Sequence, residues 1–175
     1  MAARKTASFG QPFNYSQMRY EGAAIPPPMQ PLHQQLIERL GIPFNNCLLN
    51  YYQTGKKTMG FHSDDTSGLI DGTGVAIVSL GSTRHISFRS IEMPSIEVAY
   101  PLAPGSMLYM DDAVQKAWTH AIKREKGVGS RISLTWRAVR AGSLALDVCQ
   151  HRLQRRQVCM KVTEDGDELT HGAIL

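Results

Sequence analysis

The feature that most constrains the fold is a series of eight short runs rich in β-branched and aromatic residues. The runs are separated by clusters of Gly, Pro, Asp and Ser, which favour turns. The runs cover residues 46–52, 60–64, 74–80, 85–89, 96–100, 106–110, 118–122 and 131–139. Many short strands separated by turn signals are typical of antiparallel sandwiches and barrels. The sequence therefore predicts a mostly β fold.

One helix is expected before this series, over residues 31–40. Apolar residues recur there at helical spacing, and Gly41 followed by Pro43 supplies a stop. The proline run at 26–28 precedes it and predicts an extended, non-helical stretch.

The 175 residues, 42% of them hydrophobic, suffice for one core. The regular strand spacing ends near residue 140, so we expect one domain over 3–140 and a C-terminal extension of unknown structure over 141–175, with a short helix at 147–161. The net charge is +4, and residues 1–140 carry 15 Lys and Arg against 10 Asp and Glu. That excess is compatible with a polyanion partner and equally with ordinary solubility charge.

Neither a secretory leader nor an apolar run long enough to span a membrane is present. The three cysteines, Cys47, Cys149 and Cys159, form no CxxC pair and predict neither a disulfide framework nor a thiolate zinc site. We therefore expect an intracellular protein of the cytoplasm or nucleus, not secreted and without a membrane partner.

The segment His62-Ser63-Asp64 predicts part of a metal site. Residues two apart in a strand share a face, so an imidazole and a carboxylate lie side by side. His120 has the best strand context for a third ligand. Two histidines and one carboxylate leave three coordination positions open, as in non-heme Fe(II) oxygenases. An HxD motif with a distant histidine also arises by chance.

The run RISLTWR at 131–137 alternates polar and apolar residues. Arg131 and Arg137 share one face with two hydroxyl residues, an arrangement that suits a small dicarboxylate. The alternative is a surface strand whose polar face meets water. Asn50 and Tyr52 likewise share a face and offer short-range hydrogen bonds, although Tyr52 taken singly fits a core aromatic better than a ligand contact.

Four segments in this order resemble the AlkB family of Fe(II)- and 2-oxoglutarate-dependent dioxygenases, in its eukaryotic and viral nucleic-acid repair branches. They are NYYQTGKKTMGFHSDD, LGSTRHISFR, PLAPGSMLYMDDAVQKAWTH and RISLTWR. The resemblance extends upstream to ARKTASFG and covers about residues 3–140.

This resemblance implies a double-stranded β-helix, or jelly-roll, with a flanking N-terminal helix. The cofactors would be Fe(II), 2-oxoglutarate and O2. Iron would be held by His62, Asp64 and His120. The 2-oxoglutarate would be held by Asn50, Tyr52, Arg131 and Arg137, with Arg131 on the distal carboxylate and Arg137 near the end bound to iron. Ser133 stands where the family usually has Asn.

The implied reaction is oxidative demethylation of alkylated bases such as 1-methyladenine and 3-methylcytosine, with release of formaldehyde, succinate and CO2. A flipped base would stack between His62 and Phe9, and Asp65 would meet its amino group. Ordinary core packing is an equal alternative for Phe9. Thr66 replaces an acidic residue of the family and weakens one contact near the base.

The chain starts where family members still have an upstream hairpin that probes duplexes. We therefore expect it to act on methylated single-stranded DNA or RNA. We also expect a monomer. Basic residues in turns and strand ends are candidates for phosphate contacts, and a solvated surface explains them equally well. They are Lys56, Lys57, Arg84, Arg89, Lys123, Arg124 and Lys126.

Two other functions remain open. The same cofactors could serve a hydroxylase of a protein side chain or small metabolite, because fold and cofactor geometry do not fix the substrate. A catalytically silent binding module with this fold is disfavoured, because it would retain all three metal positions and both arginines without use.

Overall fold

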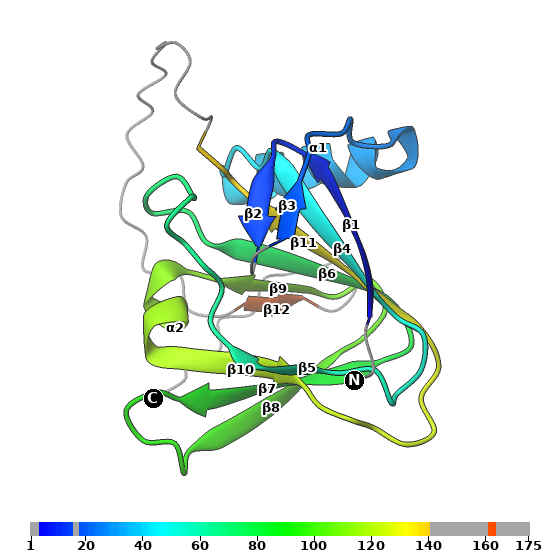
Figure 1. Cartoon of the computed structure of the whole chain (residues 1–175), viewed down its shortest axis with the longest axis vertical. Helices are drawn as coiled ribbons and strands as arrows, with labels where there is room; N and C mark the ends of the chain where they lie inside the picture. Colours follow the sequence, from blue (N-terminus) through cyan, green and yellow to red (C-terminus); the bar gives the residue numbers. More distant parts are fainter. Residues whose placement is uncertain (1–3, 16–17, 141–160, 164–175) are drawn as a thin grey trace.

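The computed structural model describes residues 4–15, 18–140 and 161–163. Two antiparallel sheets face each other, and one helix covers the outer side of the larger sheet (Figure 1). The larger sheet has the strand order β1-β4-β11-β6-β9-β12. Its strands are β1 (Lys5–Gly10), β4 (Asn46–Tyr52), β11 (Arg131–Arg137), β6 (Val75–Gly81), β9 (Met107–Met110) and β12 (Lys161–Thr163).

The smaller sheet has the order β5-β10-β7-β8. Its strands are β5 (Met59–His62), β10 (Trp118–Ile122), β7 (Arg84–Ser90) and β8 (Glu97–Leu102). Two short strands, β2 (Phe13–Tyr15) and β3 (Met18–Tyr20), pair only with each other in the described chain. The predicted mostly antiparallel β architecture is what the structure contains.

Strand β11 has one apolar face and one polar face, and both are buried. Its even-numbered residues Ile132, Leu134 and Trp136 pack in the core under the helix, and its polar residues line the space between the sheets. The alternation predicted from the sequence is therefore present. The polar face is buried and not exposed to water as in a surface strand, since Arg131 and Arg137 are each 1% exposed.

Helix α1 (Gln30–Leu40) forms the outer layer. Leu36 is its buried residue, and it packs in one cluster with Phe44 and Trp136 on the outer side of the larger sheet. The helix ends at Gly41, whose φ of 66° is left-handed and whose N–H binds the carbonyl of Ile37. Both the predicted helix and its glycine stop are present.

Several segments differ from the sequence prediction. The proline run was expected to exclude a helix, but Pro27–Met29 form a 3-10 turn leading into α1, because the φ of proline suits a first helical turn. Strand β5 ends at His62, so Asp64 lies beyond it, not within it as predicted. The sequence also missed β1, β2, β3 and the short helix α2 (Asp112–Ala117).

Strand β5 contains an irregularity where it pairs with β10. His120 pairs with His62, but Ile122 pairs with Met59, so β5 uses one residue more than β10 over this stretch. Such a bulge lets residues at odd spacing share a face. Met59 and His62 accordingly both line the space between the sheets.

Part of the C-terminal extension adds to the larger sheet. Strand β12 pairs with β9, with Val162 opposite Leu108. The helix expected at 147–161 lies outside the described residues, apart from Lys161, which belongs to this strand. Within the described part of the chain, no helix has the length and apolar character needed to cross a membrane.

Candidate metal and co-substrate site

The two histidines of the predicted metal site are brought together by strand pairing. His62 is the last residue of β5, and His120 lies opposite it in the middle of β10. Their ring centroids are 4.3 Å apart. The third strand β7 pairs with the other side of β10, so the position of His120 is fixed from both sides.

Asp64 completes the cluster from the loop after β5. One ligand atom from each of His62, Asp64 and His120 lies within 4.8 Å of the others. The carboxylate oxygen Oδ2 is 3.8 Å from Nε2 of His120, and Oδ1 accepts a hydrogen bond of 2.7 Å from Arg137. Asp64 and His120 are 7% and 6% exposed. The structure thus assembles the three residues that the sequence predicted.

The protonation states suit metal binding. Burial opposes ionisation of Asp64, but Arg137 and the two histidines outweigh it and hold its pKa below the ordinary value. Burial lowers the pKa of His120 to about 4, so its imidazole is neutral near pH 7. Nδ1 of His62 donates to the carbonyl of Gly60, which leaves Nε2 as the ligating nitrogen. An ionised carboxylate and neutral imidazoles are the forms that bind metals.

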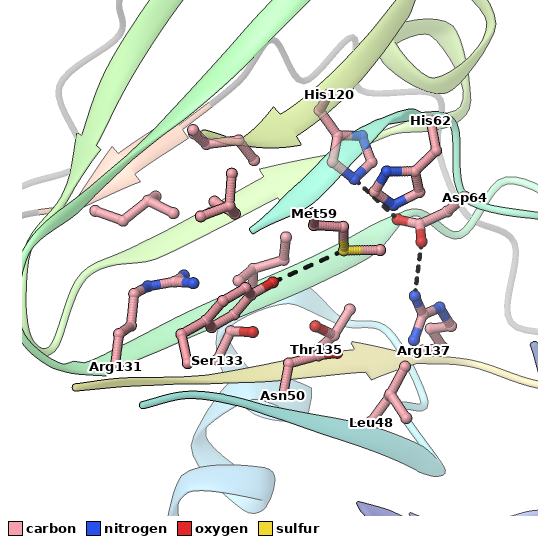
Figure 2. A pocket seen from close by; sticks show the side chains of 15 residues that line it. Leu48, Asn50, Met59, His62, Asp64, His120, Arg131, Ser133, Thr135 and Arg137 are labelled. Carbon is pink, nitrogen blue, oxygen red and sulfur yellow. Dashed lines mark hydrogen bonds and ion pairs between the residues drawn. The ribbon is translucent and has the colours of Figure 1, made fainter. Parts of the chain in front are cut away.

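A pocket extends from this cluster between the two sheets (Figure 2). The larger sheet contributes its polar wall, and apolar side chains such as Ile77, Ile86 and Leu102 close the rest. The polar wall consists of Asn50 and Tyr52 on β4 and Arg131, Ser133, Thr135 and Arg137 on β11. All four residues predicted for 2-oxoglutarate therefore line the same pocket as the three predicted metal ligands.

Arg131 and Arg137 lie at opposite ends of this polar wall. Figure 2 shows Arg137 beside Asp64 and Arg131 at the far end of the pocket. Nη2 of Arg131 donates to Ser79 at 2.7 Å, while its Nε has no hydrogen-bond partner among the described residues. Burial lowers the pKa of Arg131 to about 10, so it is cationic near pH 7. A buried guanidinium with a spare donor is suited to a carboxylate.

Tyr52 and Asn50 complete the polar wall. The Tyr52 ring lies 5.5 Å from the Arg131 guanidinium, and its hydroxyl donates to the sulfur of Met59 at 3.7 Å. Nε of Arg4 donates to Oδ1 of Asn50 at 2.7 Å, so the amide group of Asn50 is left with Nδ2 as its donor. The pocket therefore carries cationic and neutral donors in a largely apolar surround.

This donor set fits Fe(II) and 2-oxoglutarate. Two imidazoles and one carboxylate hold non-heme Fe(II) and leave adjacent positions open. A dicarboxylate needs cationic groups at separated points, and the pocket has buried arginines at its two ends. The unpaired Nε of Arg131 is the structural observation that fits the co-substrate.

The predicted substrate residues are placed less favourably. Phe9 on β1 is in register with Cys47, which belongs to the outer core under α1. Because paired residues share a face, the structure does not bring Phe9 to the pocket. Asp65 is exposed in the loop after Asp64, and its side chain accepts a hydrogen bond from Ser67 N–H at 2.9 Å.

The candidate phosphate contacts differ in exposure and in their partners. Arg84 is 0% exposed and donates to Glu125 and to backbone carbonyls of Lys57 and Lys123, so its predicted surface role is wrong. Arg89 and Lys123 form ion pairs with Glu97. Lys57 is partly buried, whereas Lys56, Arg124 and Lys126 are exposed.

Sequence reasoning missed two residues at the site. Phe13 on β2 is 7% exposed, and the Arg137 guanidinium lies 5.3 Å from its ring centroid. Gln115 on α2 hydrogen-bonds to Asp64. The signal for α2 was Asp111, whose side chain caps the helix by accepting from Val114 N–H at 2.8 Å. No comparable signal marks Phe13, because its position depends on how β2 folds over the sheets.

The fold and the site together define a class of protein. Two facing antiparallel sheets that bring two histidines and a carboxylate beside buried arginines are the arrangement of a 2-oxoglutarate-dependent iron oxygenase. Residues 4–137 match the family model described as the 2OG-Fe(II) oxygenase superfamily. The chain belongs to this superfamily, which confirms the predicted enzyme class and the cofactors Fe(II), 2-oxoglutarate and O2.

Individual relatives confirm the resemblance to AlkB proteins. The chain is 34% identical to Uncharacterized protein R406 of Acanthamoeba polyphaga mimivirus over 125 residues, 70% of this chain and 64% of that protein. It is 31% identical over 147 residues to human Alpha-ketoglutarate-dependent dioxygenase alkB homolog 3, covering 78% of this chain and 51% of that protein. Human DNA oxidative demethylase ALKBH2 gives the same identity and share of this chain, with 56% of that protein covered.

The chain thus spans about half the length of these two human relatives. A solved structure, that of OsALKBH1, shares the fold with a TM-score of 0.59 and 18% identity, over 76% of this chain and 77% of that chain. This likeness confirms the predicted jelly-roll fold.

Proposed function

We propose that this protein is an oxidative demethylase of alkylated bases in nucleic acid, such as 1-methyladenine and 3-methylcytosine. The products are the repaired base, formaldehyde, succinate and CO2. The observation that carries the proposal is the pocket that joins the His62, Asp64 and His120 cluster to a buried arginine with an unpaired donor. The similarity to DNA oxidative demethylase ALKBH2 supports the choice of substrate class.

The proposed roles follow from placement. His62, Asp64 and His120 hold Fe(II), which when bound activates O2 at the expense of 2-oxoglutarate. Arg131, which Figure 2 shows at the end of the pocket away from Asp64, pairs with the distal carboxylate of 2-oxoglutarate. Arg137 lies beside Asp64 and stabilises negative charge at the metal end. Asn50 and Tyr52 donate hydrogen bonds along the wall between these ends.

The apolar walls exclude water from the reacting methyl group. Met59, Ile86 and Ile122 line the pocket beside the metal cluster. His62 is partly exposed, so its imidazole is the group of the cluster best placed to stack on an incoming base. Asp65, ionised and exposed in the adjoining loop, is the proposed partner of the exocyclic amino group.

We propose single-stranded DNA or RNA as the preferred substrate, because unpaired bases reach a buried site at a lower unstacking cost. Exposed Lys56, Arg124 and Lys126 are the candidates for phosphate contacts. The proposed working form is a monomer of the cytoplasm or nucleus, with residues 3–140 as its catalytic unit. The alternative is a hydroxylase of a protein side chain or small metabolite with the same cofactors.

One comparison tests the proposal. The protein is incubated with Fe(II) and 2-oxoglutarate and with methylated single-stranded RNA, single-stranded DNA or duplex DNA. Succinate, formaldehyde and repaired base are measured together. We expect stoichiometric formation of all three with at least one single-stranded substrate, and none when Fe(II) or 2-oxoglutarate is omitted. Equal rates on duplex DNA would contradict the strand preference. If metal binds and none of the nucleic acids stimulates turnover, the alternative hydroxylase is favoured.

A further inference from the structure

The short helix α2 places a neutral amide against the carboxylate of Asp64. Gln115 is 5% exposed and comes from the segment between β9 and β10. Its Oε1 accepts from the backbone N–H of Asp64 at 3.0 Å, and its Nε2 donates to Oδ2 of Asp64 at 3.2 Å. One side chain therefore holds both the backbone and the carboxylate of the same residue.

The hydrogen bond from the Asp64 backbone N–H to Gln115 takes the place of a strand-ladder hydrogen bond, which Asp64 does not make. Strand β5 ends at His62, so the ladder to β10 does not fix the backbone two residues later. A buried N–H without a partner would be costly, and the Gln115 carbonyl satisfies it. This contact sets the point from which the Asp64 side chain leaves the backbone.

The hydrogen bond from Nε2 of Gln115 is made to one of the two carboxylate oxygens of Asp64, Oδ2. Oδ1 is bound by the Arg137 guanidinium at 2.7 Å, whereas Oδ2 lies 3.8 Å from Nε2 of His120. Oδ2 is thus the oxygen on the side of the histidine ligand, and it is the one that Gln115 holds. A neutral donor orients this oxygen without adding a second cation beside the metal position.

The helix that carries Gln115 is itself anchored. Asp111 accepts the N–H of Val114 at its side chain and the N–H of Gln115 at its carbonyl, at 2.8 Å and 3.1 Å. Val114 packs against the core between the sheets. The amide is therefore presented from a fixed turn directly ahead of β10, the strand that bears His120.

We infer that Gln115 is a positioning residue that orients the Asp64 carboxylate for metal binding. The inference rests on the metal site proposed above. Groups that hydrogen-bond to metal ligands in this way set ligand orientation, and their loss weakens metal binding by about 10- to 100-fold. Gln115 needs to touch neither metal nor substrate to act in this way.

The test measures affinity for Co(II) added to the full metal-free chain, followed by calorimetry. Gln115→Met keeps the length of the side chain but removes both polar contacts. Gln115→Asn keeps an amide that is too short to span them. We expect dissociation constants about 10- to 100-fold higher for Gln115→Met and a smaller rise for Gln115→Asn. The control Lys116→Met changes an exposed residue of the same helix and leaves the affinity unchanged.

Unfolding of the metal-free proteins separates positioning from stability. Melting temperatures of the Gln115 variants within a few degrees of the wild type, together with weaker Co(II) binding, support the inference. Unchanged Co(II) affinity in Gln115→Met, or loss of the folded state in both variants, overturns it. Asp64→Ala abolishes Co(II) binding if the proposed metal site is right. Co(II) binding requires no turnover. The test of Gln115 therefore still gives a result if none of the nucleic acids proves to be a substrate.

Discussion

Arg137 and Asp64 form a buried ion pair of 2.7 Å between the last residue of β11 and the loop that follows β5. The pair joins the larger sheet to the metal cluster on the smaller sheet. Sequence reasoning assigned the two residues to different ligands, Asp64 to iron and Arg137 to 2-oxoglutarate. Their contact means that the carboxylate is ionised and oriented before either ligand binds.

Replacing Arg137 by Met leaves the Asp64 carboxylate buried without its main counter-charge. We expect the metal-free protein to lose about 3 to 5 kcal/mol of unfolding free energy, because an unpaired buried charge is strongly destabilising. Urea unfolding near neutral pH measures this loss. Arg137→Lys keeps a cation without the planar fork and should lose less. Equal stability of Arg137→Met and the wild type would show that the pair contributes little.

Replacing His62 or Asp64 by Ala removes one of three proposed metal ligands. We expect neither variant to form succinate or formaldehyde at a detectable rate with Fe(II), 2-oxoglutarate and a methylated single-stranded oligonucleotide. His85→Ala is the matched control, because His85 is exposed and pairs with Glu125 away from the metal cluster. Full turnover by either ligand variant would refute the proposed triad.

Replacing Arg131 by Ala removes the cation at the far end of the pocket. We expect the KM for 2-oxoglutarate to rise by about 10- to 100-fold, since hydrogen bonds to charged groups contribute about 1.5 to 3 kcal/mol. Steady-state succinate formation at varied 2-oxoglutarate measures the effect. Arg124→Ala, which removes an exposed arginine, should leave this KM unchanged. An unaltered KM in Arg131→Ala would place the distal carboxylate elsewhere.

The ionised carboxylate of Glu125 is expected to stabilise the fold in a pH-dependent way. Burial opposes its ionisation, but hydrogen bonds from His85 and Arg84 outweigh burial and lower its pKa from 4.5. A carboxyl with a lowered pKa stabilises the fold above its unfolded pKa and loses that effect as pH falls through its folded pKa. Glu125→Gln should therefore be less stable than the wild type near neutral pH, and the difference should shrink below about pH 4.5.

Unfolding free energies at several pH values between neutral and acid check this prediction. Glu92→Gln serves as the control, because Glu92 is exposed. A stability difference that stays constant, or grows, on acidification would show that ionisation of Glu125 is not responsible.

The central strands were predictable because their pattern is local. Residues 46–52 and 118–122 were predicted with the bounds observed for β4 and β10, and the alternation in β11 assigned both of its faces correctly. Strand β1 was missed because KTASFG has little strand character of its own and depends on pairing with β4.

The metal and co-substrate residues were predictable from the sequence, but the residues that hold them in place were not. The spacing of His62 and Asp64 identified both, although Asp64 lies in a loop and is positioned by Gln115, 51 residues further along the chain. Phe9 was predicted and Phe13 was not considered, because motif similarity does not reveal strand register. Register turns Phe9 toward the outer core, whereas Phe13 packs on Arg137.

The bulge in β5 makes the register of this strand as important as its side chains. Met59 and His62 face the same pocket although three positions separate them, which only the extra residue permits. A regular ladder over the same residues would place Met59 and His62 on opposite faces and turn one of them away from the pocket. The metal position therefore depends on the register of β5 as well as on its residues, and a count of ligands in the sequence would not detect that dependence.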